Sequence, residues 1–172
     1  MDFGGAALLL LFVAPAFVLV LLLVRADGGS AFVVRRRVVG RGGREFGLLA
    51  FRAPGEADGQ RLTRFGQALR WTALEELPRL LNVMRGDMSL VGPRPVTREA
   101  LERSYALFGG AAAYQSVRPG LIGPCQVCGR SVLSARDRVA LDTAYAQRPS
   151  LRADLTILAR AVGAVRRRPE VR

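Results

Sequence analysis

The chain has 172 residues, with 26 arginines and neither lysine nor histidine, and 14 acidic residues give it a formal net charge of +12. This length suits one domain and excludes a large modular enzyme. The composition also excludes lysine Schiff bases, histidine general bases and histidine metal ligands. Hydrophobic residues make up 50 % of the chain, which fits a globular core or a membrane contact rather than a disordered chain.

An apolar segment runs from Phe3 to Val24, with no charged residue in its 22 positions. As a helix rising about 1.5 Å per residue it would reach roughly 33 Å, enough to cross the apolar core of a bilayer. A cleaved signal peptide is the alternative, but the acidic Asp2 and the large apolar residues after Ala16 argue against cleavage. The arginines that follow the segment predict that the rest of the chain is cytoplasmic.

Pro15 lies in the middle of this segment, where its missing N–H and its ring kink or break a helix. Two geometries follow from the kink. A kinked helix would span the membrane, whereas a helix bent at Ala14-Pro15 would enter and return to the same face. Composition alone slightly favours the kinked span.

The elements that follow are predicted from local patterns. The stretch 31–52 alternates apolar runs around a glycine-rich turn at 40–43, which predicts a β-hairpin. Apolar residues then recur at intervals of three and four between positions 61 and 84, which predicts two helices broken near Trp71 and Thr72. We expect loops over 90–95 and 118–130, and helices over 97–108, 135–147 and 151–165.

Two adjacent acids, Glu75 and Glu76, begin one of the predicted helices. A helix N-terminus favours negative charge and binds phosphate through its free N–H groups, and Mg²⁺ commonly takes one or two carboxylates plus substrate phosphates. A structural role is the alternative, because residues 72–75 match a capping box in which Glu75 bonds back to the backbone of Thr72. Spacing alone favours the capping box.

Two arginines are each held next to a proline. Arg94 lies between Pro93 and Pro95, and Arg118 precedes Pro119. Such a rigid presentation suits bidentate binding of phosphate, although a solvated loop arginine is the usual alternative. These segments occur together with the acidic pair, which favours the functional interpretation.

The run TALEELPRLLNVMRGDMSLVGPRP at 72–95, followed by VRPG at 117–120 and QV at 126–127, resembles the monotopic phosphoglycosyl transferases, also called bacterial sugar transferases. Weaker similarity covers almost all of the remaining chain. The resemblance implies an α+β fold, mainly helical, with a re-entrant or spanning membrane helix at residues 1–26. It implies that residues 27–172 form a compact body with a small β-hairpin, on the cytoplasmic face of a bacterial inner membrane.

The resemblance also implies a reaction. The family moves a sugar 1-phosphate from a UDP-sugar to undecaprenyl phosphate and releases UMP, as the first membrane step of exopolysaccharide, O-antigen or glycan assembly. By position, Glu75 would be the catalytic nucleophile, and Glu76 would be the second catalytic acid and the ligand of a Mg²⁺ cofactor. The residues implied in binding substrate or phosphate are Arg52, Arg70, Arg94, Arg118, Gln126 and Asp142.

The sequence departs from the family pattern at three positions. Glu75 stands where the family carries aspartate, and its extra methylene displaces the carboxylate by about 1 Å, a shift that lowers rates when geometry is tight. Ala50 and Val38 stand where the family carries basic residues. These departures support an alternative function, a non-catalytic membrane homologue that binds polyprenol phosphate or nucleotide sugar, or regulates an active partner.

Cys125 and Cys128 form a Cys-x-x-Cys pair, which elsewhere would suggest redox chemistry or half of a zinc site. Because the chain has no histidine and no second cysteine pair, a complete zinc site would need two chains. By the resemblance, both cysteines fall at positions where the family carries variable small or apolar residues, so we expect reduced, packed thiols.

The basic run Arg166–Arg168 follows an amphipathic pattern that includes Leu155, Leu158 and Ala161. With no nucleic-acid motif beside it, we expect the partner to be anionic membrane lipid rather than nucleic acid. The sequence leaves open whether the chain forms a homo-oligomer.

Overall fold

The computed structural model describes residues 33–52, 63, 66, 67, 69, 72, 74–128 and 134–165. The chain forms two compact units, the first from residues 1–37 and 47–86 and the second from residues 38–46 and 87–172. The predicted membrane segment and its boundary after residue 26 lie outside the described residues. Among those that are described, no helix is long and apolar enough to cross a bilayer.

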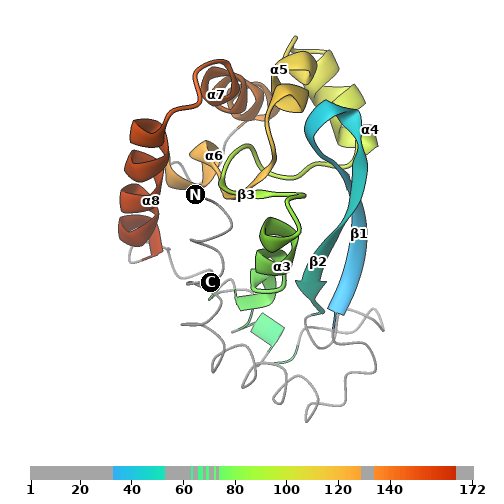
Figure 1. Cartoon of the computed structure of the whole chain (residues 1–172), viewed down its shortest axis with the longest axis vertical. Coiled ribbons are helices and arrows are strands. Elements are labelled where there is room, and N and C mark those ends of the chain that lie inside the picture. The colour runs from blue at the N-terminus through green and yellow to red at the C-terminus, as the bar shows by residue number, and fades with distance from the viewer. Residues whose placement is uncertain are drawn as a thin grey trace. The chain divides into compact units, whose positions relative to one another are not determined.

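A β-hairpin begins the described chain (Figure 1). Strand β1 (Val33–Val39) pairs with β2 (Glu45–Phe51), and the 3-10 turn η1 (Arg41–Gly43) joins them. Gly42 and Gly43 have φ angles of 69° and 74°, a left-handed conformation that glycine adopts without steric cost. The prediction of a hairpin with a glycine-rich turn is confirmed.

In the first unit a short helical stretch is docked against β2. The 3-10 turn η2 (Leu74–Glu76) is followed by α3 (Arg79–Met84), which buries Leu80 and Val83. Asn82, with 0 % of its surface exposed, donates from Nδ2 to the Gly47 carbonyl at 2.9 Å and accepts from the Leu49 amide at 3.0 Å. One buried amide side chain thus satisfies a donor and an acceptor of the strand.

The second unit contains a small parallel sheet that the sequence does not reveal. Strand β3 (Ser89–Val91) pairs with β4 (Gly120–Ile122), with Ser89 opposite Gly120 and Val91 opposite Ile122. The short helix α6 (Pro124–Val127) follows β4. These elements correct the expected loops over 90–95 and 118–130: strands of three residues are too short to show an alternating pattern.

The helices of the second unit largely match the expectation. α7 (Ala135–Gln147) and α8 (Leu151–Val165) have the predicted bounds. The helix expected over 97–108 begins as α4 (Arg98–Ala100) and continues as the π-helix η3 (Leu101–Ala106), and α5 (Ala111–Ser116) follows. The hairpin, η3, α5 and α7 share a core of Val39, Leu101, Tyr105, Tyr114 and Val139.

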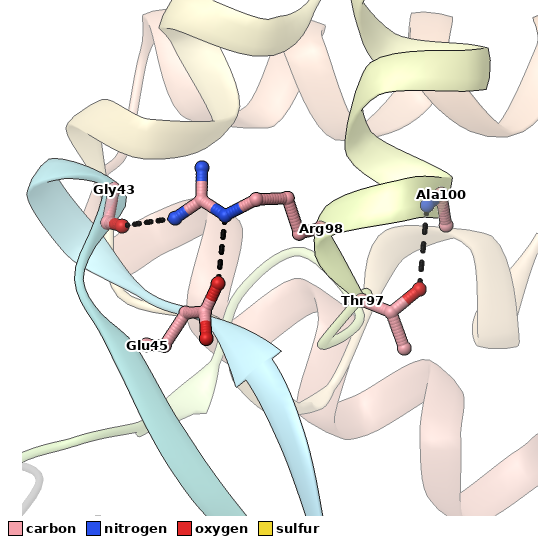
Figure 2. Close-up of polar contacts among 5 residues, drawn as sticks. All are labelled: Gly43, Glu45, Thr97, Arg98 and Ala100. Carbon is pink, nitrogen blue, oxygen red and sulfur yellow. Dashed lines mark hydrogen bonds and ion pairs between the residues drawn. The ribbon is translucent and has the colours of Figure 1, made fainter.

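The tip of the hairpin is fastened to α4 by one arginine (Figure 2). Arg98 donates from Nε to the Glu45 carboxylate at 2.7 Å and from a terminal nitrogen to the Gly43 carbonyl at 3.0 Å. Beside it, the Thr97 hydroxyl caps α4 by accepting from the Ala100 amide at 3.3 Å. The start of α4 and the turn of the hairpin are therefore held in one geometry.

Close contact between glycine backbones at the β3–β4 pair provides a test of the fold. A Cβ on Gly120 would overlap the backbone of Gly92, whereas a Cβ on Gly163 in α8 would meet nothing within 4 Å. We expect Gly120→Ala to lower the free energy of unfolding by about 1 to 3 kcal/mol, as overpacking does, and Gly163→Ala to raise it by up to about 1 kcal/mol. Urea unfolding of both variants measures this, and equal stabilities would contradict the close approach.

Candidate functional site

The predicted site residues divide between the two units. Arg52, Glu75 and Glu76 belong to the first unit. The second unit contains Arg94, Arg118, Gln126 and Asp142. Arg70 lies outside the described residues.

The acidic pair of the first unit lies on η2, and both carboxylate side chains are half-buried. Consecutive residues of a 3-10 turn project about 120° apart, because such a turn holds three residues. The Glu76 carboxylate forms an ion pair with Arg79, in which a carboxylate oxygen and a terminal guanidinium nitrogen are 2.9 Å apart. The two side chains therefore leave the turn in different directions although they are neighbours in sequence.

Arg79 and Asn82 are the residues of this unit that the sequence analysis left without a role. The side chains of Arg79 and Glu76 are 11 % and 17 % exposed, so their ion pair is largely shielded from water. Glu76, Arg79 and Asn82 are spaced three residues apart, and Arg79 and Asn82 lie on the buried face of α3. Polar residues at this spacing within an apolar helix are the sequence signal that would have found them.

The donor chemistry of the acidic pair fits Mg²⁺. Carboxylate oxygens are hard ligands, and Mg²⁺ usually takes one or two of them and keeps water or phosphate oxygens at its other positions. Within the described ranges, no group of three or more acidic or cysteine side chains could hold a metal ion. Arg52, half-buried just after β2, belongs to the same unit.

In the second unit the two arginine–proline segments lie against each other. The Gly92 amide donates to the Ile122 carbonyl at 3.1 Å, and the Gly120 amide donates to the Pro93 carbonyl at 2.8 Å. Ser89 N–H donates to the Pro119 carbonyl at 2.9 Å. Backbone hydrogen bonds from both sides thus fix the loops next to the two arginines.

These loops present Arg94 and Arg118, whose side chains are both exposed. A Cβ placed on Gly92 would lie 2.6 Å from the Arg118 carbonyl oxygen, so the backbone of one segment runs directly past the other. Rigid loops with exposed guanidinium groups suit the binding of phosphate oxygens.

Gln126 has a structural contact in α6. Its side-chain oxygen accepts from the Gly123 amide at 2.6 Å, while the residue remains exposed. It thereby satisfies one of the amides at the start of this short helix.

Asp142 lies in the interior of the second unit, with 0 % of its surface exposed. Its Oδ2 accepts from the Tyr105 hydroxyl at 2.5 Å, and its Oδ1 accepts from the Cys125 thiol at 3.2 Å. Each carboxylate oxygen therefore has a protein donor. Cys125 and Cys128 are free thiols and both are half-buried.

Burial is the main influence on the titration of this cluster. It raises the pKa of Asp142, while the hydrogen bonds from Tyr105 and Cys125 act in the opposite direction. The charges of Arg138 and Arg94 also lower the pKa of Asp142, which shows that Arg94 acts electrostatically on the buried carboxylate. Burial raises the pKa of Cys125 to about 12, so this thiol is a hydrogen-bond donor rather than a nucleophile at neutral pH.

The raised pKa of Cys125 makes stability depend on pH in the alkaline range. Between about pH 9 and pH 12 the native thiol keeps its proton while the unfolded thiol has lost it, so the free energy of unfolding falls as pH rises. Cys125→Ser retains a donor toward Asp142 and removes this titration. As pH rises over this range, we expect the free energy of unfolding of Cys125→Ser to fall less steeply than that of the wild type, by up to about 1.4 kcal/mol per pH unit. Urea unfolding of both proteins at several pH values in this range measures the difference. Identical dependence of the free energy of unfolding on pH would contradict the raised pKa of Cys125.

Comparison with known proteins identifies the chain's relatives. Residues 1–168 match the family described as bacterial sugar transferase. The exopolysaccharide production protein ExoY of Rhizobium meliloti is 39 % identical over 192 residues, which cover 95 % of this chain and 83 % of the relative. A UDP-glucose:undecaprenyl-phosphate glucose-1-phosphate transferase of Caulobacter vibrioides is 38 % identical, over 94 % of this chain and 67 % of the relative.

A UDP-galactose-lipid carrier transferase of Erwinia amylovora is also 38 % identical, over 97 % of this chain but only 40 % of that longer protein. The similarity to these relatives and the family match both extend over nearly the whole chain, including the acidic pair and both arginine–proline segments. The chain belongs to the bacterial sugar transferase family.

Proposed function

We propose that this chain transfers a sugar 1-phosphate from a UDP-sugar to undecaprenyl phosphate and releases UMP. The names of relatives support this class of donor and acceptor, since one is a UDP-glucose:undecaprenyl-phosphate glucose-1-phosphate transferase. The observation that carries the proposal is the turn η2, which holds two half-buried acids next to each other, with Glu76 paired to Arg79. As in exopolysaccharide production, the transfer would be the first membrane step of assembling a glycan.

Glu75 acts as the nucleophile in this proposal. One of its carboxylate oxygens attacks the phosphorus that carries the sugar, and the bond from that phosphorus to the bridging oxygen breaks, so that UMP leaves. A phosphate oxygen of undecaprenyl phosphate then attacks the same phosphorus and frees the carboxylate. The product is undecaprenyl diphosphate sugar. Division into two displacements means that the nucleotide and the lipid phosphate need not meet directly.

Glu76 has a separate role in this scheme. Its ion pair with Arg79 fixes the direction of the carboxylate, which would hold Mg²⁺. When bound there, Mg²⁺ would neutralise charge on the diphosphate of the donor. Arg79 in turn is placed by α3, which Asn82 ties to β2.

Arg94 and Arg118 bind phosphate oxygens of the substrates. Both are exposed, and both stand on loops whose backbone is fixed by hydrogen bonds, so little freedom is lost when a ligand binds. Arg52, Arg70 and Gln126 complete the predicted substrate contacts. Substrate binding by Asp142 stays a prediction; its two oxygens accept from Tyr105 and Cys125 in the structure.

The proposed reaction takes place at the cytoplasmic face of the bacterial inner membrane, where undecaprenyl phosphate is available to the chain. The apolar segment 3–24 would anchor the protein there, either as a re-entrant or as a spanning helix.

The residue type at position 75 favours a second candidate function. A glutamate in place of the family's aspartate moves the carboxylate by about 1 Å, and such a displacement of a reacting group can cost about a hundredfold in rate. A chain that kept the binding residues but lost turnover would bind polyprenol phosphate or nucleotide sugar, or regulate an active partner.

Release of UMP separates the two candidates. We would purify the wild type, Glu75→Asp and Glu75→Ala, and assay each with Mg²⁺, undecaprenyl phosphate and a panel of UDP-sugars. We expect release by the wild type and its loss in Glu75→Ala, because only the nucleophile is removed. Glu99→Ala is the matched control, since Glu99 is 78 % exposed and pairs with the equally exposed Arg103. Activity of Glu75→Asp with a silent wild type would favour the non-catalytic candidate.

The role of the arginine–proline segments predicts a binding defect. We expect Arg118→Ala and Arg94→Ala each to lower kcat/KM for the UDP-sugar by about tenfold to a hundredfold, the range for loss of a charge-assisted hydrogen bond. Arg103→Ala is the control, because this arginine is 78 % exposed and lies on η3. Steady-state kinetics measure the effect, and values equal to that of the control would contradict phosphate binding.

A further inference from the structure

The proposed function leaves the Cys-x-x-Cys pair without a role. Cys125 lies within α6, and Cys128 directly follows this helix with a backbone that is still helical, at φ −73° and ψ −3°. Residues three apart in an α-helix have Cα atoms about 5 Å apart, within the range of about 4.4 to 6.8 Å that a disulfide spans. The backbone therefore allows the two free thiols to be joined without moving.

The two thiols have different hydrogen-bond partners. The Cys125 thiol donates to Asp142 Oδ1 at 3.2 Å, on the neighbouring helix α7. The Cys128 thiol donates to the Cys125 carbonyl at 3.1 Å, because helical side chains lean toward the N-terminus of their helix. One thiol thus faces a buried carboxylate, and the other is turned back over its partner cysteine.

These partners set the order in which the thiols react. Burial, followed by the charge of Asp142, raises the pKa of Cys125 to about 12, so this thiol keeps its proton at neutral pH. A thiol must lose its proton before it attacks a disulfide. Cys128 donates to a neutral carbonyl rather than to a carboxylate. Cys128 is therefore the thiol that reacts first, and Cys125 the one that follows.

We propose that Cys125 and Cys128 form a reversible disulfide, with a low-molecular-weight disulfide as the oxidant and Asp142 as the acceptor of the Cys125 proton. The Cys128 thiolate attacks one sulfur of the small disulfide, whose S–S bond breaks as one small thiolate leaves. The Cys125 sulfur then attacks the Cys128 sulfur, its proton passes to Asp142 Oδ1, and the second small thiolate leaves. The two small thiolates take up the two protons. The cysteine pair is thus oxidised by two electrons, and the small disulfide is reduced to two thiols.

The surroundings of Asp142 suit this proton transfer. Its Oδ2 accepts from the Tyr105 hydroxyl at 2.5 Å, which leaves Oδ1 directed at the Cys125 thiol. Burial raises the pKa of Asp142, which makes the carboxylate a stronger base than an exposed aspartate. Protonation also removes a charge from the interior, where a charge is costly. The inference goes beyond the proposed function, because thiol exchange at this cluster needs neither a sugar nucleotide nor a lipid.

Mass spectrometry of the full-length protein tests the disulfide. The folded protein in nanodiscs is treated with glutathione disulfide, and the free thiols are then alkylated with N-ethylmaleimide. We expect the wild type to form an internal disulfide that dithiothreitol reverses, and Cys125→Ser to stop at a mixed disulfide on Cys128. Cys128→Ser should react at least about tenfold more slowly than Cys125→Ser. Unreacted thiols in the folded wild type, a disulfide between two chains, or equal rates for the two serine variants would overturn the inference.

The role of Asp142 is measured on the second step alone. Asp142→Asn keeps an oxygen that accepts a hydrogen bond but cannot take the proton. We expect this variant to form the mixed disulfide at the wild-type rate and to close it about a hundredfold more slowly.

Asp137→Asn is the matched control, because it makes the same change at an exposed acid of α7 that accepts from the Ser134 hydroxyl. Thermal unfolding checks that each variant is folded, and the serine variants test the disulfide independently of Asp142→Asn. Closure by folded Asp142→Asn at the rate of the control would overturn the assignment of Asp142 as the proton acceptor.

Discussion

Contact between the backbones of Gly92 and Gly120 is the constraint on which the second unit depends. The absence of side chains at these two positions lets β3 and β4 approach closely enough for the segments after and before them to exchange hydrogen bonds. This close approach fixes the positions of the loops that carry Arg94 and Arg118. The buried end of the same arrangement is Asp142, whose pKa responds to Arg94. The close packing of two glycines thus determines where the charged side chains of this unit lie.

In the first unit, polar side chains hold the acidic pair in place. Asn82 occupies a fully buried position and satisfies both hydrogen-bonding groups that β2 directs toward it. One turn earlier, Arg79 holds Glu76. The acid pair is therefore supported by a polar stripe that continues through the helix to the strand, which is the kind of support that a precisely aimed carboxylate requires.

The elements that the sequence predicts correctly have strong local signals. Glycines mark the turn of the hairpin, Ser134 caps α7, and apolar periodicity marks α8. The acidic pair and the arginine–proline segments stand out in the sequence by residue type, but their functional assignment comes from the family resemblance and stays a prediction. The β3–β4 pair and the cluster around Asp142 depend on partners far along the chain, at 37 residues for Tyr105 and 17 for Cys125, so no local pattern reports them. For α8 the sequence indicates an amphipathic helix, but only packing against α6 decides which leucines face outward.

The π-helix η3 has a consequence for how this chain can vary in length. A π-helical turn holds about one residue more than an α-helical turn, and within this segment Leu101 and Tyr105 face the core while the Tyr105 hydroxyl donates to Asp142. Loss of any one residue between 101 and 106 would return the segment to α-helical register and rotate Tyr105 about 100° away from the carboxylate. Related chains that keep this hydrogen bond must therefore place their insertions and deletions outside the segment, and the exposed turn at Leu107 to Gly109 offers the nearest position.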